Sequence, residues 1–262
     1  MEYIKHLLIR TPFEKPAQKL QEILKFRRRS QHPELGEIHM EPLRIEQAMQ
    51  RILFDSANCL DIGCHIGSML SDILRLAPKG DHIAFEPTPY KARWLKQKFP
   101  EIEIREIALS DTSGETKFYV NTSRSGFSGL GKPNPNSNPK NNETLLEINI
   151  QCERLDNILS PEYRVDFIKI DVEGYELAVL RGAVDTLKRY RPALLFECTR
   201  GGLSRSGFTS TQIFEFLTQH QSYSVFLLKD FLKDNQPLDY ERFNNALQYP
   251  FQAFNFIAIA KS

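Results

Sequence analysis

Acidic residues stand at the ends of five apolar stretches of the chain. They are Asp61, Glu86, Asp111, the pair Asp171 and Glu173, and Glu197. Because the carboxyl ends of parallel strands lie along one edge of a sheet, this pattern predicts a rim of carboxylates at that edge. Such groups can accept hydrogen bonds from the hydroxyls of a ligand or take a proton from a reacting group.

The first of these stretches leads into a turn with two glycines. Residues 58–68 indicate a buried strand that ends in Asp61, a turn with Gly63 and Gly67, and the start of a helix. A strand, turn and helix in this order often hold a nucleotide-like ligand, and glycine allows tight turns and close approach of the backbone. Glu86 follows Gly63 by 23 residues, close to the spacing at which an acid binds both hydroxyls of a ribose.

Each member of this set also has a purely structural explanation. Asp111, Asp171 and Glu173 fit the N-cap or the first turn of a helix. His65, inside the glycine turn, fits a side chain that packs or hydrogen-bonds within the loop. Asp171 and Glu173 are two acids without a third evident ligand, which predicts no metal. Taken together, the acids favour a ligand site over a series of unrelated caps.

The elements that must position these residues alternate between strands and helices. Apolar strand candidates cover residues 59–62, 82–85, 102–109, 167–170 and 193–196. Helical patterns cover residues 68–76, 89–98 and 175–190. Alternation of this kind predicts a parallel α/β sheet, and short apolar strands bounded by Gly, Pro or acids suit a sheet covered on both faces.

A polar tract interrupts the alternation. Residues 121–143 are rich in Asn, Ser, Pro and Gly, and strand-like pieces at 116–120 and 145–150 flank them. Long loops in compact domains are more often functional or disordered than idle, so we interpret this tract as a loop or lid. Its Asn, Ser and Arg side chains could bond the hydroxyls of an acceptor; a disordered insertion without a role is the alternative.

The two ends of the chain carry further elements. After Glu197 we expect a helix over 209–219, with Thr209 or Ser210 as its N-cap, and strands at 224–228 and 254–260 that form a closing hairpin at the sheet edge. Helical patterns at 14–29 and 41–54 indicate an N-terminal helical extension, residues 1–57, before a main domain of residues 58–262. The basic cluster 25–29 fits the last turn of a helix better than a phosphate site.

Composition narrows the class of protein. The 262 residues carry 34 Lys and Arg against 33 Asp and Glu, a balance that predicts no nucleic-acid partner and no anionic membrane surface. The four cysteines have no zinc-site spacing and suit reduced thiols in the cytoplasm, where we place the protein. No apolar run approaches the roughly 18 residues of a membrane span, and the N-terminus lacks the pattern of a signal peptide.

Four blocks of this sequence stand out together, at residues 60–67, 85–87, 108–114 and 168–183, and the run KIDVEGYE at 169–176 is the most specific. They resemble the FkbM family of S-adenosylmethionine-dependent methyltransferases. Their order and spacing match the family over about residues 58–198. One departure is Cys64-His65 between the two glycines, where the family usually has Ala-Asn.

The resemblance implies a class I methyltransferase-like, Rossmann-like fold. This is a mostly parallel sheet of seven strands, the last one antiparallel, with helices on both faces. By the same likeness Asp61, Gly63, His65 and Gly67 would cradle the methionine part of S-adenosylmethionine, Glu86 would hold the ribose, and Ala108 would border the adenine. Asp171 is placed beside the cofactor as well.

The expected reaction is methylation of a hydroxyl on a small molecule or sugar. Asp171 and Glu173 are the first candidates for the base that takes the hydroxyl proton, and His65 is a third. A nicotinamide-dependent oxidoreductase is a competing interpretation, but residues 63–67 lack the GxGxxG spacing that suits a pyrophosphate. A methyltransferase-like module that only binds a partner is another. The acceptor and the oligomeric state stay open, a homo-oligomer included.

Overall fold

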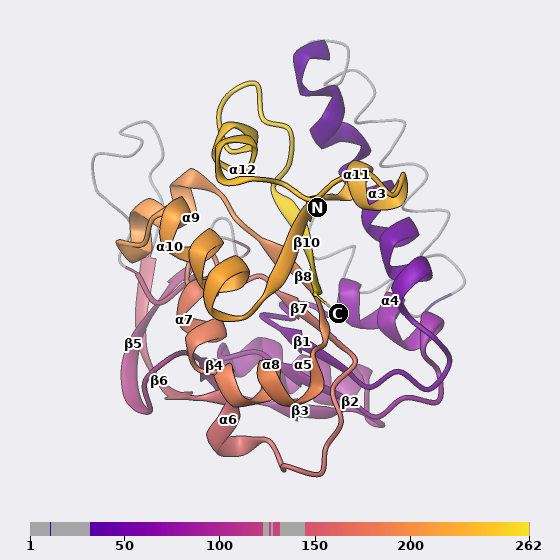
Figure 1. Ribbon diagram of the computed structural model, residues 1–262. Helices are drawn as coiled ribbons and strands as arrows, with labels where there is room; N and C mark the ends of the chain where they lie inside the picture. The colour runs from indigo at the N-terminus through magenta and orange to yellow at the C-terminus, as the bar shows by residue number, and fades with distance from the viewer. Residues whose placement is uncertain (1–10, 12–31, 123–125, 127, 132–144, 262) are drawn as a thin grey trace.

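A seven-stranded sheet forms the centre of the molecule (Figure 1). The computed structural model describes residues 11, 32–122, 126, 128–131 and 145–261. The sheet has the order β3-β2-β1-β7-β8-β10-β9. Its strands are β1 (Cys59–Ile62), β2 (His82–Phe85), β3 (Glu103–Arg105), β7 (Phe167–Ile170), β8 (Ala193–Glu197), β9 (Tyr223–Leu227) and β10 (Asn255–Ala260). The strand β10 runs opposite to the other six strands of this sheet, which confirms the fold class that the resemblance implies.

Helices cover both faces of this sheet because its short strands are apolar on both sides. All four residues of β1, of β2 and of β7 are buried. Cys59 and Phe167 pack toward one helix layer, whereas Leu60 and Ile168 pack toward the other. The first layer holds α3 (Gly36–Ile52), α4 (Ser68–Leu76), α5 (Pro89–Lys98) and α11 (Leu228–Leu232). The second holds α6 (Leu155–Ile158), α7 (Glu176–Arg181), α8 (Val184–Tyr190), α9 (Arg200–Ser206), α10 (Ser210–Glu215) and α12 (Tyr240–Ala246).

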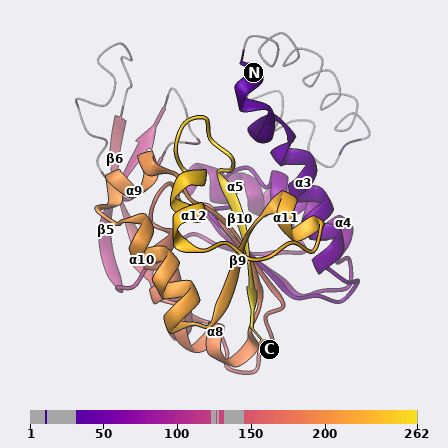
Figure 2. The same cartoon turned by 45° about the horizontal axis from the view of Figure 1, so that its top comes forward.

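A second, three-stranded sheet stands beside the first, and the sequence did not reveal it as a separate sheet. It has the order β4-β6-β5 and consists of β4 (Ala108–Leu109), β5 (Gly114–Asn121) and β6 (Leu145–Glu153). Figures 1 and 2 show β5 and β6 on the side of the molecule opposite α3 and α4. The expected single strand over 102–109 is therefore wrong: β3 pairs with β2, and the chain then leaves that sheet so that β4 pairs with β6.

Two expected elements differ for local reasons. The helix expected over 175–190 is divided at Gly182, where an added Cβ would lie 2.0 Å from the carbonyl oxygen of Ser110. The helix expected over 209–219 is α10 followed by a π-helical turn, Phe216–His220, and Thr209 is its N-cap with a complete capping box. The expected closing hairpin of β9 and β10 does lie at the edge of the sheet, with β10 antiparallel to both β8 and the edge strand β9.

The N-terminal part of the described chain begins with a short 3-10 helix, Pro33–Leu35, and α3, which starts earlier than the expected residue 41. Helix α3 contacts α4 and α11. The helix expected over 14–29 and the basic cluster 25–29 lie outside the described residues, as do residues 123–125, 127 and 132–144 of the polar tract and its border. The division at residue 57 and the lid stay predictions.

The four cysteines are free and buried, which confirms the expected reduced thiols. Within the described residues, no helix combines the length and the apolar character needed to cross a membrane.

Candidate active site

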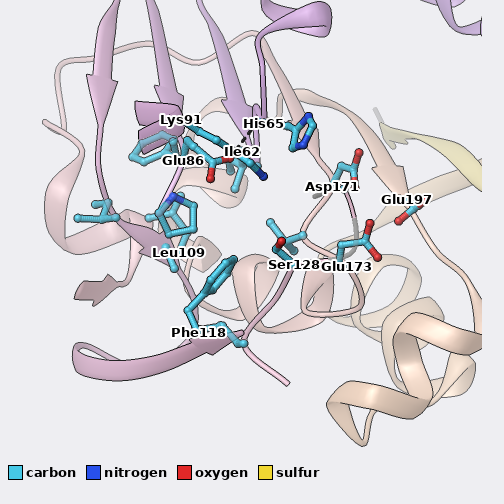
Figure 3. Close-up of a pocket in the computed structure, with 18 residues that line it drawn as sticks. Ile62, His65, Glu86, Lys91, Leu109, Phe118, Ser128, Asp171, Glu173 and Glu197 are labelled. Carbon is cyan, nitrogen blue, oxygen red and sulfur yellow. Dashed lines mark hydrogen bonds between the residues drawn. The ribbon is translucent and has the colours of Figure 1, made fainter. Parts of the chain in front are cut away.

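A pocket of about 290 Å³ opens where the carboxyl ends of the central strands meet the small sheet (Figure 3). The large sheet and the segments after its strands contribute Ile62, Gly63, His65, Phe85, Glu86, Pro87, Lys91, Asp171, Val172, Glu173 and Glu197. The small sheet and its connections contribute Ile107, Ala108, Leu109, Phe118, Gly126, Ser128 and Leu130. The expected rim of acids therefore lines one cavity, with the exceptions of Asp61 and Asp111.

The glycine turn forms one wall of this pocket. Gly63 has φ +75°, and an added Cβ would lie 1.9 Å from the carbonyl oxygen of Asp171. The turn is also tied to β2, because the N–H groups of Gly63 and Cys64 donate to the Phe85 carbonyl at 3.0 and 3.1 Å. His65 has φ +53° and lines the pocket. Gly63 thus lets the turn pass directly over the end of β7.

Glu86 is a buried carboxylate held from two sides. Its Oε2 accepts a hydrogen bond from the His65 N–H and its Oε1 accepts one from the Thr88 N–H, each at 3.0 Å. Burial raises the pKa of Glu86, and the charge of Lys91 lowers it in part. Each carboxylate oxygen can accept a second hydrogen bond, so Glu86 retains acceptors for two hydroxyl groups in the pocket.

Asp61 lies beneath the pocket and not on its surface. It is fully buried, and its Oδ1 lies 3.2 Å from the Nζ of Lys169. The same ammonium group donates to the Gly63 carbonyl at 2.8 Å and lies 3.7 Å from Asp171 Oδ2. Burial alone would lower the pKa of Lys169, but the charges of Asp61 and Asp171 raise it above its ordinary value. Asp61 therefore acts on the site through Lys169, which fixes both the glycine turn and Asp171.

Gly67 also lies away from the pocket. It is the N-cap of α4 with φ +79°, and an added Cβ would lie 2.5 Å from a ring carbon of Phe99 and 2.9 Å from Leu95. Both contacts are to α5 and its C-cap. The small size of Gly67 thus serves the packing of α4 on α5.

Asp171, Glu173 and Glu197 form the acidic end of the pocket. One carboxylate oxygen of each lies within 4.8 Å of the others, and Figure 3 shows the group opposite Glu86 and Lys91. Burial and the neighbouring Asp171 raise the pKa of Glu173 to about 7, while Arg205 lowers it in part. Burial, with the charges of Asp171 and Glu173, raises the pKa of Glu197 well above its ordinary value. Burial and mutual repulsion thus favour the protonated forms of Glu173 and Glu197.

Asp171 and Asp111 do not cap helices, although the sequence also offered that explanation for both. The N-cap of α7 is Tyr175, with no side-chain cap, and Glu176 Oε1 instead accepts from the N–H groups of Val172 and Gly174 at 3.1 Å each. Asp171 is thus free of a capping role. Asp111 accepts a hydrogen bond from the Ser110 hydroxyl at 3.2 Å. It does not cap a helix either, because the next described helix along the chain is α6 and its N-cap is Arg154.

The acidic end differs from the sequence expectation in having a third carboxylate. In the described part of the chain, it is the one group of three or more His, Cys, Asp or Glu side chains close enough to share a cation. Two of its members already face cations of the chain, since Arg205 bonds Glu173 at 2.7 Å and Lys169 lies 3.7 Å from Asp171. We therefore assign no metal to it.

Several residues in and beneath the pocket were not predicted from the sequence. Lys91 is 4% exposed and Ser128 is 9% exposed, and both line the pocket with Phe118. Lysine on a surface helix carries no signal of burial. Lys169 could have been noticed, because a cation inside the apolar strand Phe167–Ile170 requires a buried partner.

Comparison with known proteins decides the family. The model of the methyltransferase FkbM domain matches residues 61–225, more than half of the chain. The chain belongs to the FkbM methyltransferase family. This confirms the resemblance seen in the four sequence blocks, and S-adenosylmethionine is the cofactor of the family. The interpretation as a nicotinamide-dependent oxidoreductase is set aside.

Two curated proteins are similar to parts of this FkbM domain. The 2-O-methyltransferase NoeI of Sinorhizobium fredii is 28% identical over 144 aligned positions, which cover 50% of this chain and 59% of NoeI. The AMB antimetabolite synthetase AmbE of Pseudomonas aeruginosa is 28% identical over 168 positions, which cover 51% of this chain and 8% of AmbE. The similarity thus spans little more than half of NoeI and a small part of AmbE.

Among solved structures, a methyltransferase FkbM from Methylobacillus flagellatus aligns with 15% identity and a TM-score of 0.43, over 79% of this chain and 44% of that one. An rRNA methylase from Streptococcus thermophilus aligns with 11% identity and a TM-score of 0.45, over 86% and 96% of the two chains.

Proposed function

We propose that this FkbM domain transfers a methyl group from S-adenosylmethionine to a hydroxyl group of a small molecule or sugar. The observation that carries the proposal is the pocket itself, with the buried acceptor Glu86 at one end and the acidic end at the other. One end suits the binding of a nucleoside, and the other suits the removal of a proton.

The residues of the pocket fit this cofactor. Glu86 would accept hydrogen bonds from the ribose hydroxyls, and Ala108, Leu109 and Phe118 of the small sheet supply an apolar surface for the adenine. The turn from Gly63 to His65 would lie beside the methionine part. When bound, S-adenosylmethionine supplies an electrophilic methyl group on a positively charged sulfur. Asp61 would contribute through Lys169, which donates to the Gly63 carbonyl, and Gly67 through the packing of α4 on α5.

A hydroxyl acceptor must lose its proton at or before transfer. Asp171 and Glu173 line the pocket and are the proposed bases, with His65 as the third candidate. The remaining contribution of the protein is alignment of the reacting groups, which can supply several kcal/mol without a covalent intermediate.

The choice of a hydroxyl acceptor has two supports. NoeI, a relative at 28% identity, is named a 2-O-methyltransferase, and the carboxylates of the acidic end are suitable acceptors for hydroxyl protons. The formal net charge of +1 does not favour a nucleic acid. A small molecule or sugar with a hydroxyl group is the class of acceptor that fits these supports and the nearly neutral charge.

Calorimetric titration with S-adenosylmethionine tests the cofactor half of the proposal. We expect the intact protein to bind, Glu86→Ala to lose most of the affinity because the ribose acceptor is gone, and Asp61→Ala to lose part of it through the glycine turn. Glu162→Ala, an exposed acid remote from the pocket, is the matched control and should bind as the wild type does. Absence of binding by the intact protein would refute the proposal.

The acceptor is identified by incubating a metabolite extract with the protein and methyl-labelled cofactor, followed by mass spectrometry. A labelled product with a methylated hydroxyl supports the proposal and names the substrate. If the protein binds the cofactor but labels nothing in any extract, the alternative of a methyltransferase-like binding module is favoured instead.

A further inference from the structure

A largely buried ion pair joins α9 to the turn that carries Glu173. Arg205 Nη2 donates to Glu173 Oε2 at 2.7 Å, and the two side chains are 21% and 18% exposed. Glu173 lines the pocket, whereas Arg205 does not. The Nε atom of Arg205 is buried without a hydrogen-bond partner among the described residues, so the contact with Glu173 is the main compensation for burying this guanidinium.

Two glycines bring α9 close enough for this contact. An added Cβ on Gly174 would lie 2.1 Å from the carbonyl oxygen of Gly202, and one on Gly202 would lie 2.9 Å from the Cα of Gly174. Thr199 caps α9 and accepts from the Gly202 N–H at 3.0 Å. The backbone of α9 therefore lies directly on the turn after β7, with Arg205 less than one helical turn beyond the point of contact.

The backbone of the same turn is restrained separately. Glu173 has φ +58°, an uncommon conformation for a residue with a side chain, and Gly174 follows with φ +106°. Glu176 Oε1 fixes this conformation by accepting from the N–H groups on both sides of Glu173, those of Val172 and Gly174. Glu176 thus fixes the backbone conformation at Glu173, and Arg205 fixes the position of the Glu173 carboxylate. Unusual backbone conformations persist where the surroundings over-determine them, and they cluster at active sites.

Charged groups surround Glu173 from every neighbouring element. They are Asp171 at the end of β7, Glu197 at the end of β8, Glu176 of α7, Lys91 of α5 and Arg205 of α9. The carboxylates and burial disfavour the charged form of Glu173, while Arg205 and Lys91 favour it. Of the two cations, Arg205 is the one with a hydrogen bond to the carboxylate.

We propose that Arg205 is a positioning residue for methyl transfer, which holds the carboxylate of Glu173 at the acidic end of the pocket as the acceptor of the hydroxyl proton. The part that Glu173 plays as a base rests on the proposed function. The restraint of Glu173 by Arg205 does not, and it can be measured without cofactor or acceptor.

The test is a titration of Glu173 by carboxyl ¹³C NMR between pH 5 and 9, in protein labelled with ¹³C-glutamate and with Glu173→Gln to assign the signal. In the wild type the midpoint should lie near the pKa of about 7. Arg205→Gln should raise it by about one pH unit or more, because an opposite charge at hydrogen-bond distance lowers a carboxyl pKa by that amount. Arg205→Lys should keep the midpoint near the wild-type value.

Arg200→Gln is the matched control, since Arg200 is an exposed residue of the same helix that bonds Asn244 at 3.4 Å. It should leave the midpoint unchanged. An unchanged midpoint in Arg205→Gln, or an equal shift in Arg200→Gln, would overturn the proposal. Should Arg205→Gln not fold, Arg205→Met keeps the apolar stem and removes the charge; a raised midpoint in that variant supports the proposal and an unchanged midpoint overturns it. Once an acceptor is known, the acid limb of the pH profile of kcat/KM should move upward with the Glu173 midpoint.

If the proposed function is wrong but the restraint by Arg205 is right, S-adenosylhomocysteine does not bind the wild type, while the titration still shows that Arg205 controls the pKa of Glu173. Because Arg205 lies outside the pocket lining, binding of S-adenosylhomocysteine should be nearly the same in Arg205→Gln and the wild type if both proposals hold.

Discussion

Replacement of Gly63 by alanine should damage the site through the backbone and not through a lost side-chain contact. The new Cβ would lie 1.9 Å from the carbonyl oxygen of Asp171 and 3.2 Å from Val172 Cγ1. That carbonyl cannot easily move, since Asp171 directly follows β7 and its N–H donates to the Ile62 carbonyl at 3.1 Å. The glycine turn must therefore shift away from β7.

The size of the effect follows from two contributions. Gly63 has φ +75°, and a residue with a Cβ in the left-handed region loses about 1–2 kcal/mol. Overpacking against a fixed neighbour adds about 1–3 kcal/mol. The free energy of unfolding should thus fall by about 2–5 kcal/mol in all.

Gly207 supplies the control, because it has the same φ of +75° and an added Cβ would meet nothing within 4 Å. Gly207→Ala should lose only the contribution of the backbone conformation, about 1–2 kcal/mol. Both variants are compared by urea unfolding, followed by circular dichroism and by the fluorescence of Trp94, the single tryptophan. The difference between the two variants measures the clash with Asp171.

The same pair of variants separates stability from binding. The turn from Gly63 carries the His65 N–H that holds Glu86, so Gly63→Ala should weaken the binding of S-adenosylhomocysteine at a temperature where both variants are folded. Gly207→Ala should not. The reasoning is refuted if the two variants lose equal stability and bind equally well.

Two further predictions concern buried charges. Burial raises the pKa of Glu176 from 4.5 to about 7, so the stability that its protonated form contributes is complete below pH 4.5 and lost as the pH rises through 7. In the wild type this group should lower the free energy of unfolding by about 3 kcal/mol between pH 5 and 8. Glu176→Gln should lack this fall when urea unfolding is measured across the same pH range. The same pH dependence in the variant and the wild type would contradict the prediction. Lys169→Met should cost about 3–5 kcal/mol because Asp61 stays buried without its cation, and addition of Asp61→Asn should restore part of that stability. No recovery in the double variant would show that the pair does not act as a unit.

The large sheet could be read from the sequence because its signals are local. The bounds of β1, β2, β7, α4 and α5 agree with the expected ranges, since each element is a short apolar run or a helical pattern between glycine, proline or an acid. Glu86 could be assigned for the same reason: its distance along the chain from the glycine turn depends only on a strand, a helix and two short connections.

Other features depend on how segments pair in space. The stretch 102–109 has one apolar pattern, yet it is shared between two sheets because β6, more than 35 residues later, offers β4 a partner that β2 does not. The sequence had no means to choose between these partners. Strand pairing joins distant segments, and local pattern carries no information about it.

The acidic end shows the same division between sequence and structure. The sequence alone predicted that acids stand at the carboxyl ends of β1, β2, β7 and β8, and that they meet at one edge of a sheet. Only the tertiary structure decided that Asp61 turns inward to Lys169, that Glu197 joins Asp171 and Glu173, and that Arg205 reaches Glu173. The physical reason is that strand order brings these groups to within several ångströms of one another. The direction of each side chain and the packing of Gly174 against Gly202 then decide which groups come into hydrogen-bond contact, and proton transfer depends on that contact.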